Sequence, residues 1–317
     1  MSSESADLAP LVVVVGPTAS GKSALGIELA RRFNGEVVVC DSTQVYRHFD
    51  IGTAKVPLAE QHGIPHHLTD LVEPNEIFTA GEYRRRAISV LNDLKRRAKL
   101  PVVTAGTGLY LRALLEGLAE APERSEELRS RLREMAQRSG PEYLHRLLAK
   151  IDREAAQRIA VRDTQKVIRA IEIRMLARQT VGDVHRSGRE PLQGFRVVKL
   201  GLSPDRESLY ARIEARTDHM IAAGWLDEVR KLVANNIFID AKPFQFIGYA
   251  ELNDHLEGKI GMEEAVRRIQ RATRQFAKRQ ITWFRREPDV HWLAGFGDDP
   301  AVLEQASTIV MNVTAPQ

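Results

Sequence analysis

The sequence predicts an α/β fold, in which a parallel sheet of the P-loop NTPase type is flanked by helices and interrupted by an all-helical insertion. Three observations support this prediction. Short apolar runs rich in valine alternate with amphipathic helical patterns, as in βαβ units. The first run leads directly into a glycine-rich phosphate loop. From about Pro122 to Gln179 the chain is rich in Arg, Glu, Leu and Ala and shows helical periodicity alone.

The elements of the first part follow in order. Leu11–Val15 is a fully apolar, β-branched run, which is typical of a buried parallel strand. A helical pattern extends from Lys22 to Phe33, and Glu36–Cys40 forms a second strand. Thr79–Ala98 has the spacing of an amphipathic helix, and Pro101–Thr104 is a third strand that ends in a glycine-containing turn. The alternation predicts helices on both faces of one sheet.

The core continues beyond the helical region. Arg196–Leu202 has the pattern of another core strand. We therefore predict a core domain formed by residues 1–121 and 191–317, and a helical insertion domain at 122–190.

The remaining segments are predicted from composition. Val181–Gly194 is polar, contains three glycines and one proline, and is expected to be a mobile connector. Helices resume at Arg206, and the last long helix covers about Met262–Arg286. The residues from Thr314 onward are expected to fray.

The composition is that of an ordinary globular chain. The 317 residues are 43% hydrophobic and 28% charged, which is enough to bury a large core. A single cysteine excludes an intramolecular disulfide, and no apolar run reaches the roughly 18–20 residues of a membrane span. No basic, apolar leader precedes the first strand, so we expect a cytoplasmic protein without a membrane partner. The net charge of +4 is compatible with an anionic partner.

Residues 16–23 match the phosphate-loop pattern G-x-x-x-x-G-K-[ST] between a strand and a helix. The backbone N–H groups of such a loop and the helix N-terminus surround phosphate oxygens, and the lysine adds a full positive charge. The serine hydroxyl is a ligand for Mg²⁺. The pattern predicts a diphosphate or triphosphate site, with Ser23 as metal ligand, formed by Gly16, Thr18, Ala19, Ser20, Gly21, Lys22 and Ser23.

Polar residues follow the other two strands. P-loop NTPases usually hold the metal with an acid at a strand end. The third strand instead runs into Ala105-Gly106-Thr107-Gly108 without an acid, which disfavours an ATP-hydrolysing motor. The acid follows the second strand, at Asp41. Ligands bind beyond the carboxyl ends of parallel strands, so Asp41 and Thr107 should share one crevice with the phosphate loop.

Two interpretations of these residues stay open. Asp41 is either a metal ligand or general base, or a turn residue whose short side chain caps the backbone. Its neighbours Ser42, Gln44 and Tyr46 favour function. Thr107 is either a hydroxyl that meets a ligand in an open turn or an ordinary turn residue.

The last long helix carries a cationic stripe that we expect to be uninterrupted by acids. A polyanion such as nucleic acid would relieve the repulsion along it. At 100° per residue the stripe comprises Arg267, Arg271, Arg274, Lys278 and Arg285, and the opposite, apolar face comprises Met262, Ala265, Ile269, Ala272, Phe276 and Trp283.

A helix in the insertion has a similar division. Gln165, Arg169 and Glu172 share one face, where they either contact nucleic acid or form an intrahelical pair. The opposite face is predicted to consist of Val167, Ile168, Ile171 and Met175.

Two further features are weak signals. His62, His66 and His67 lack cysteine partners, which favours a histidine-containing loop over a zinc site. Cys40 is expected to be buried and inert.

Together these motifs resemble the tRNA dimethylallyltransferase (tRNA isopentenyltransferase) family of bacteria over residues 11–286. The motifs that carry the resemblance are GPTASGKS at Gly16–Ser23, DSTQVY at Asp41–Tyr46, DIGTAK at Asp50–Lys55, AGTGLY at Ala105–Tyr110, RDTQKVIRAIEI at Arg162–Ile173, RIEARTDHM at Arg212–Met220, IGYAE at Ile247–Glu251 and AKRQITWFR at Ala277–Arg285.

The resemblance implies the transfer of a dimethylallyl group from dimethylallyl diphosphate to N6 of adenosine 37 in tRNA. The phosphate loop and Mg²⁺ would hold the diphosphate, with Arg216 offsetting its charge. Asp41 would accept the proton of the attacking amine, and Thr107 would hydrogen-bond near it. A monomer is expected.

The resemblance also implies a set of tRNA contacts. Gln44 is a candidate for the adenine edge, because the base must leave its stack to react. The implied contacts are Asp41, Ser42, Thr43, Gln44, Thr107, Arg129, Gln165, Lys166, Arg169, residues 245–252 with Gly248 and Tyr249, and residues 278–285 with Lys278, Arg279, Gln280, Trp283 and Arg285.

Two positions depart from the family pattern. Ala105 stands where the family usually has glycine, which questions the backbone dihedrals of that turn. Lys166 stands where arginine is usual, which keeps the charge but loses bidentate geometry. The alternatives are a P-loop kinase of a nucleoside or small molecule, a transferase acting on free adenylate, and a non-catalytic RNA-binding protein.

Overall fold

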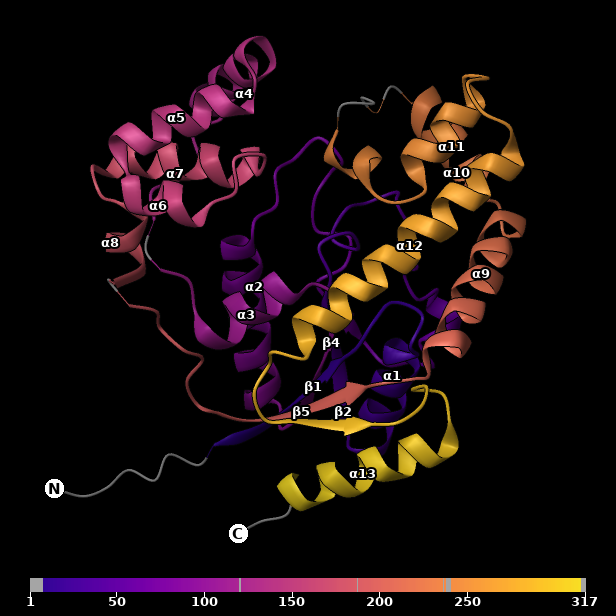
Figure 1. Cartoon of the computed structure of the whole chain (residues 1–317). Helices are drawn as coiled ribbons and strands as arrows, with labels where there is room; N and C mark the ends of the chain where they lie inside the picture. The colour runs from indigo at the N-terminus through magenta and orange to yellow at the C-terminus, as the bar shows by residue number, and fades with distance from the viewer. Residues whose placement is uncertain (1–7, 120, 187, 236, 238–240, 315–317) are drawn as a thin grey trace, which may run out of the picture. The chain divides into compact units, whose positions relative to one another are not determined.

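The computed structural model describes residues 8–119, 121–186, 188–235, 237 and 241–314. Within these residues lies a parallel sheet with strand order β3-β2-β4-β1-β5-β6 (Figure 1). Its strands are β1 (Ala9–Val15), β2 (Gly35–Cys40), β3 (His66–His67), β4 (Leu100–Ala105), β5 (Phe195–Leu202) and β6 (Val290–Leu293). The four strands predicted from the sequence are confirmed, each one to two residues longer at an end, whereas β3 and β6 were not predicted.

The strand register aligns the carboxyl ends of three neighbouring strands. Val15 of β1 and Cys40 of β2 both pair with Ala105 of β4. The phosphate loop, Asp41 and Gly106 therefore all begin at one edge of the sheet, which is where ligands of such sheets bind.

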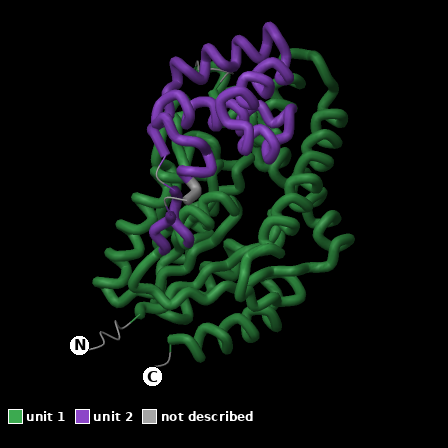
Figure 2. Tube along the Cα trace, turned by 60° about the vertical axis from the view of Figure 1, so that its left-hand side comes forward, with its two compact units in different colours: residues 1–115, 192–317 green, residues 116–191 purple. Residues whose placement is uncertain are grey.

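The chain divides into two compact units, residues 1–115 with 192–317 and residues 116–191, which are coloured separately in Figure 2. The second unit begins at Glu116, earlier than the insertion predicted to start at residue 122. We describe each unit by itself.

The helices of the first unit cover both faces of the sheet (Figure 1). They are α1 (Lys22–Arg32), α2 (Ala80–Arg96), α3 (Gly108–Glu116), α9 (Arg206–Ala222), α10 (Trp225–Ala234), α11 (Tyr249–Leu256), α12 (Met262–Phe284) and α13 (Pro300–Thr314), with 3₁₀ turns η1 (Leu58–Glu60) and η2 (Lys242–Gln245). Helix α13 was not predicted. It is largely apolar and covers the same face as α1, so the chain is helical up to Thr314.

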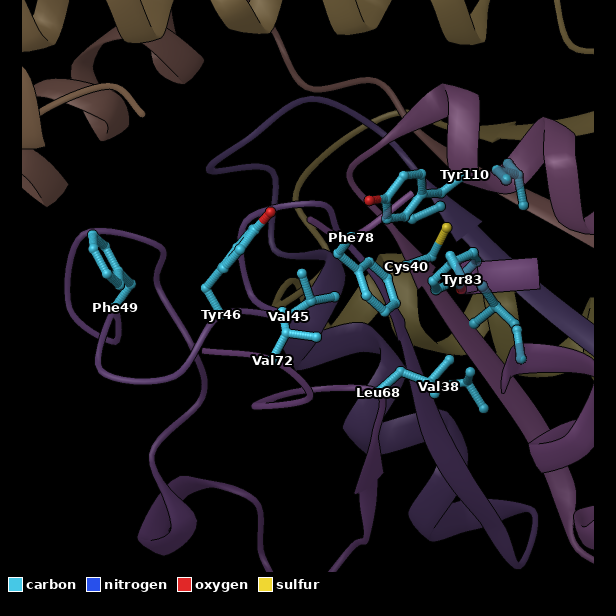
Figure 3. Close-up of a cluster of buried hydrophobic side chains, with 14 of the residues drawn as sticks. Val38, Cys40, Val45, Tyr46, Phe49, Leu68, Val72, Phe78, Tyr83 and Tyr110 are labelled. Atoms are coloured by element: carbon cyan, nitrogen blue, oxygen red, sulfur yellow. The ribbon is translucent and has the colours of Figure 1, made fainter. Parts of the chain in front are cut away.

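Alternate valines of β1 enter two separate cores. Val12 and Val14 contact apolar residues of α1 and α13, whereas Val13 and Val15 belong to the core that includes α2 and α3. Figure 3 shows part of the second core, in which Cys40 and Tyr83 lie together. Burial on both faces explains why these strands are continuous apolar runs.

The second unit is helical throughout its regular structure. Its helices are α4 (Glu126–Ser139), α5 (Pro141–Ile151), α6 (Arg153–Arg158), α7 (Thr164–Ala177) and α8 (Val181–Arg186). Side-chain oxygens of Ser125, Asp152 and Asp163 cap three of them, which is the usual role of Ser and Asp before a helix.

Two expectations for the second unit were wrong. Residues 181–186 form α8 and not a connector, because Asp183 pairs with Thr180 to cap the helix start. On α7, Val167, Ile168 and Ile171 are buried as predicted. Glu172 is completely buried and Met175 is 57% exposed, so the predicted division into two faces fails at these two residues. Among the described residues, every helix is too short or too polar to cross a bilayer.

Candidate active site

The phosphate loop of residues 16–23 has a backbone that requires glycine at position 21. Gly21 has φ of 89°, in the left-handed region, and Ala19 also has a positive φ of 63°. A side chain at Gly21 would meet the N–H group of Gly297 at 2.7 Å. The Ser20 hydroxyl is fully buried and has no hydrogen-bond partner among the described residues. This hydroxyl lies beside Gly16, where an added Cβ would be 3.0 Å from it, and Ser20 lines neither of the two cavities described below.

Two cations face this loop. Lys22 donates from Nζ to the Pro17 carbonyl at 2.7 Å, and Arg216 of α9 approaches the Thr18 hydroxyl. Burial lowers the pKa of Lys22 to about 8, with Asp41 opposing and Arg216 reinforcing the shift. Burial also lowers the pKa of Arg216, and Arg212 adds to this effect. A bound polyanion would offset the free-energy cost of burying these two positive charges.

The carboxylate of Asp41 has a different role for each oxygen. Oδ1 accepts hydrogen bonds from the backbone N–H and the hydroxyl of Thr43, at 2.8 and 2.7 Å. Oδ2 has no hydrogen-bond partner among the described residues and lies so close to Gly106 that a Cβ there would be 2.3 Å away. The turn-capping interpretation of Asp41 is therefore confirmed at Oδ1, and its role as metal ligand or general base stays a prediction.

Thr107 connects the two strand-end turns. Its Oγ1 accepts from the Ser42 backbone N–H at 2.9 Å and donates to the Ser42 hydroxyl at 3.1 Å. The N–H groups of Gly106 and Thr107 both donate to the Cys40 carbonyl. The Thr107 hydroxyl is therefore committed to positioning the Asp41–Ser42 turn.

Gln280 of α12 links the phosphate loop to the turn after β4. Its Oε1 accepts from the Thr18 N–H at 2.7 Å, and its Nε2 donates to the Gly106 carbonyl at 2.8 Å. Only 6% of the residue is exposed, so its side chain is not on the accessible face of the helix. The sequence placed Gln280 among the RNA contacts, and its bridging role had no sequence signal.

Gln44 is oriented by the following loop. Its Nε2 donates to the carbonyls of Thr53 and Ala54 at 3.0 and 3.2 Å. The amide therefore turns its acceptor, Oε1, away from those carbonyls. An acceptor in this position suits a ligand that carries an amine.

These groups line one large cavity of about 1440 Å³, which includes Thr18, Lys22, Ser23, Asp41, Gln44, Gly106 and Arg216. A second, smaller cavity of about 290 Å³ shares Thr18, Asp41 and Arg216 with the first. Its other walls are largely apolar and include Ile213, Met220, Trp225, Phe246, Ile247 and Phe276. The glycine-rich loop of residues 16–23, the Asp41 carboxylate and an apolar pocket thus meet at the edge of the sheet.

The loop after β6 also contacts the phosphate loop. The Gly297 N–H donates to the Ser20 carbonyl at 2.8 Å, and Asp298 forms a paired salt bridge with Arg212. The four-residue spacing of Arg212 and Arg216 on one helix face was the available sequence signal for this part of the site.

Some of the cations in the stripe on α12 form salt bridges with acidic residues. Arg267 pairs with Glu264 and Arg274 pairs with Glu214, so the expectation of an uninterrupted stripe was wrong. The acids come from the preceding turn and from α9. Trp283 is 39% exposed, not packed in the apolar face.

Other exposed groups remain on α12. Arg271, Lys278 and Arg285 are exposed and have no acidic partner among the described residues. Arg279 is also exposed and lies over the Phe276 ring.

Several implied RNA contacts are held inside the protein. In the second unit, Arg129 is 8% exposed and binds the buried Glu172 through two hydrogen bonds of 2.9 Å. Arg169 bonds the same carboxylate, which is the intrahelical alternative. Lys166 bonds Asp163 at the start of α7. The structure gives Gln165 no hydrogen bond among the described residues.

Gly248 and Tyr249 form a structural junction in the first unit. Tyr249 is fully buried and donates to Glu228 at 2.7 Å. Gly248 has φ of 97°, where a side chain would be strained and would collide with Trp225.

The remaining expectations have clear outcomes. Ala105 ends β4 in ordinary strand geometry, so the residue that must be glycine is Gly106. His66 and His67 form edge strand β3, contrary to the expected loop, and His67 lies 2.6 Å from Glu36. Cys40 is buried as expected, and burial raises the pKa of its thiol far above its usual range. No metal-binding cluster of His, Cys, Asp and Glu occurs in the described part of the chain.

Comparison with known proteins agrees with this geometry. Residues 44–287 match the family model described as IPP transferase. The chain is 51% identical to the tRNA dimethylallyltransferase of Solibacter usitatus, covering 94% of this chain and 96% of that protein. It is also 51% identical to the tRNA dimethylallyltransferase of Koribacter versatilis, covering 95% and 97% of the two chains.

Solved structures show the same fold. The tRNA isopentenylpyrophosphate transferase of Bacillus halodurans matches with a TM-score of 0.71 and 36% identity, covering 96% of both chains. A eukaryotic dimethylallyltransferase acting on tRNA matches with a TM-score of 0.82 and 28% identity, covering 97% of this chain and 80% of the other. The chain belongs to the IPP transferase family.

Proposed function

We propose that this protein transfers a dimethylallyl group from dimethylallyl diphosphate to N6 of adenosine 37 in tRNA and releases diphosphate. The observation that carries the proposal is Asp41, which lines the cavity that also contains the phosphate loop and whose Oδ2 has no hydrogen-bond partner among the described residues. Membership of the IPP transferase family and the names of the relatives support this choice of reaction.

The diphosphate end would bind in the phosphate loop. The phosphate loop, Lys22 and Arg216 would present donors and positive charge to phosphate oxygens. Bound Mg²⁺ would neutralise charge that builds up on the departing diphosphate. The oxygen donors fit this ion, because Mg²⁺ is held by one or two protein oxygens together with substrate phosphates. Ser23 would supply the hydroxyl ligand, as it lines the cavity at the start of α1.

The hydrocarbon would occupy the apolar cavity beside Asp41, since its walls include Ile213, Met220 and Phe276. The N6 nitrogen of adenine then attacks C1 of the dimethylallyl group, and the C1–oxygen bond breaks with its electron pair leaving on diphosphate. Oδ2 of Asp41 takes the proton released from nitrogen. A positioned general base contributes about 10²–10⁴-fold to such a step.

The adenine would be recognised by its amine. Gln44 presents Oε1 because its Nε2 is held by the carbonyls of Thr53 and Ala54. A carbonyl acceptor favours an exocyclic amine over a 6-keto group, which is itself an acceptor.

The tRNA would bind first through the exposed cations of α12, namely Arg271, Lys278, Arg279 and Arg285, with Trp283 beside them. Gln165 and Lys166 of the second unit are accessible for a further contact. Arg129 and Arg169 would act indirectly, by fixing α4 and α7 around Glu172. The proposal takes the protein to act as a monomer.

One assay separates this function from phosphate transfer. The purified protein is incubated with dimethylallyl diphosphate, Mg²⁺ and unmodified tRNA that carries adenosine 37, and the digested nucleosides are identified by mass. A parallel reaction contains ATP and nucleosides. Prenylated adenosine in the first reaction supports the proposal, whereas phosphorylated product without prenylated RNA refutes it. No observation in the structure favours the kinase.

A further inference from the structure

Glu228 of α10 binds a loop that lies far away in the sequence. Its Oε2 accepts from the backbone N–H groups of Asp50 and Ile51, at 3.0 and 2.8 Å. Its Oε1 accepts from the Gly52 N–H at 3.4 Å and from the Tyr249 hydroxyl at 2.7 Å. Three consecutive N–H groups around one carboxylate form an anion-binding nest whose anion is part of the protein.

The indole ring of Trp225 packs against the same loop. A Cβ at Gly52 would lie 2.2 Å from Nε1 of Trp225, and one at Gly248 would lie 2.0 Å from the same ring. Trp225 is only 2% exposed and is therefore wedged between two glycine backbones. The loop can rest on this ring only because position 52 has no side chain.

The loop that Glu228 holds is part of the candidate active site. Gly52, Thr53 and Ala54 line the apolar cavity next to Asp41. The carbonyls of Thr53 and Ala54 also set the orientation of Gln44. Glu228 lines neither of the two cavities, so it does not touch a substrate bound there.

We propose that Glu228 is a positioning residue for prenyl transfer, which holds residues 50–54 so that Gln44 and the apolar cavity keep their geometry beside Asp41. This inference rests on the proposed function. A group that acts through position alone can still change a rate about 100-fold, because a displacement of about 1 Å removes the reactive alignment.

The rest of the site should survive the loss of Glu228. Lys55 bonds the Tyr46 carbonyl and the Asp50 carboxylate, which anchors the other end of the loop. The phosphate loop is tied to β4 separately, through Gln280. A Glu228 variant should therefore fold and keep its affinity for inorganic diphosphate.

The kinetic test compares Glu228→Ala and Glu228→Gln with wild type. For Glu228→Ala we expect kcat/KM for tRNA to fall by about 10–100-fold, with the affinity for inorganic diphosphate unchanged within about twofold. Glutamine keeps one acceptor oxygen, so Glu228→Gln should lose less than about tenfold. Asp227→Ala is the matched control, because Asp227 is an exposed acid of the same helix that pairs only with Arg230 among the described residues.

Three kinetic results would overturn the proposal. The first is a Glu228→Ala enzyme within about threefold of wild type for tRNA. The second is a loss matched by the fraction of inactive protein in an active-site titration, which would indicate a general folding role. The third is a Glu228→Gln enzyme as impaired as the alanine variant.

A second readout does not depend on activity. In wild type, the N–H groups of residues 50–52 should be protected from hydrogen exchange, and in Glu228→Ala they should exchange at least about tenfold faster than before. Unchanged hydrogen exchange at these three positions would refute the proposal that Glu228 holds the loop, whatever the kinetic results are. A wild-type protein that prenylates no RNA would refute the proposed function instead, so the two failures are distinguishable.

Discussion

Gly106→Ala places a single methyl group against the carboxylate of Asp41. The new Cβ would lie 2.3 Å from Oδ2. Non-bonded heavy atoms settle at about 3.5 Å or more, so the carboxylate or the turn must move by roughly 1 Å. The φ of Gly106 lies outside the left-handed region, and the backbone itself therefore accepts alanine.

The expected effect is mainly on catalysis. A displacement of roughly 1 Å lowers the rate of a positioned reaction by about 100-fold. Overpacking of this kind costs about 1–3 kcal/mol of folding free energy, so the variant should still be folded. We therefore expect kcat for prenyl transfer to fall by about two orders of magnitude, with a modest decrease in Tm.

The assay measures single-turnover transfer to tRNA together with thermal unfolding. Gly261→Ala is the matched control, because an added Cβ there meets nothing within 4 Å. A Gly106→Ala enzyme whose transfer rate stays within about threefold of wild type would show that the contact with Asp41 does not govern the reaction.

Three other predictions concern charge and buried hydrogen bonds. Because the pKa of Lys22 is about 8, the affinity for inorganic diphosphate measured by calorimetry should fall as the pH rises through that value. The affinity of Lys22→Met should not fall in this pH range. An affinity of the wild-type protein that does not change with pH would contradict a role for Lys22 in binding diphosphate. Gln280→Leu leaves two backbone groups unpaired, so urea unfolding should show a loss of about 1–3 kcal/mol, and an unchanged midpoint would contradict this. Burial opposes ionisation of Glu172, but hydrogen bonds from Arg129 and its other partners lower its pKa to about 2, below its ordinary 4.5. The ionised carboxylate therefore stabilises the fold above pH 4.5, and this contribution is lost as the pH falls toward 2. In Glu172→Gln, this loss of stability between pH 4.5 and pH 2 should disappear. The variant should also be less stable than wild type by about 3–5 kcal/mol at neutral pH, since Arg129 stays buried without its charge partner.

Short sequence motifs were sufficient to predict which residues lie at the carboxyl ends of the strands. The phosphate loop and Asp41 were recognised because their chemistry requires a fixed spacing next to apolar strands. Their convergence followed from strand ends that meet in a parallel sheet. The cavity lined by Lys22 and Asp41 confirms it for the phosphate loop and Asp41, whereas Thr107 lines neither cavity.

Contacts between distant segments were not predictable in this way. The hydrogen bonds of Gln280 with Thr18 and Gly106 span much of the chain, and glutamine on a basic helix has no sequence feature that indicates burial. Glu172 was assigned to a polar face because it is charged, although two arginines bury and neutralise it. The acid that pairs with Arg274, Glu214, lies on another helix, so a helical wheel of α12 cannot show it.

The most direct test of the account is the transfer rate of Asp41→Asn. Asparagine keeps an acceptor oxygen for the Thr43 turn but cannot take a proton from the adenine amine. We predict that tRNA binding stays within about threefold of wild type while single-turnover transfer falls by about 10²–10⁴-fold. Transfer at the wild-type rate would contradict the claim that this carboxylate is the base of the reaction.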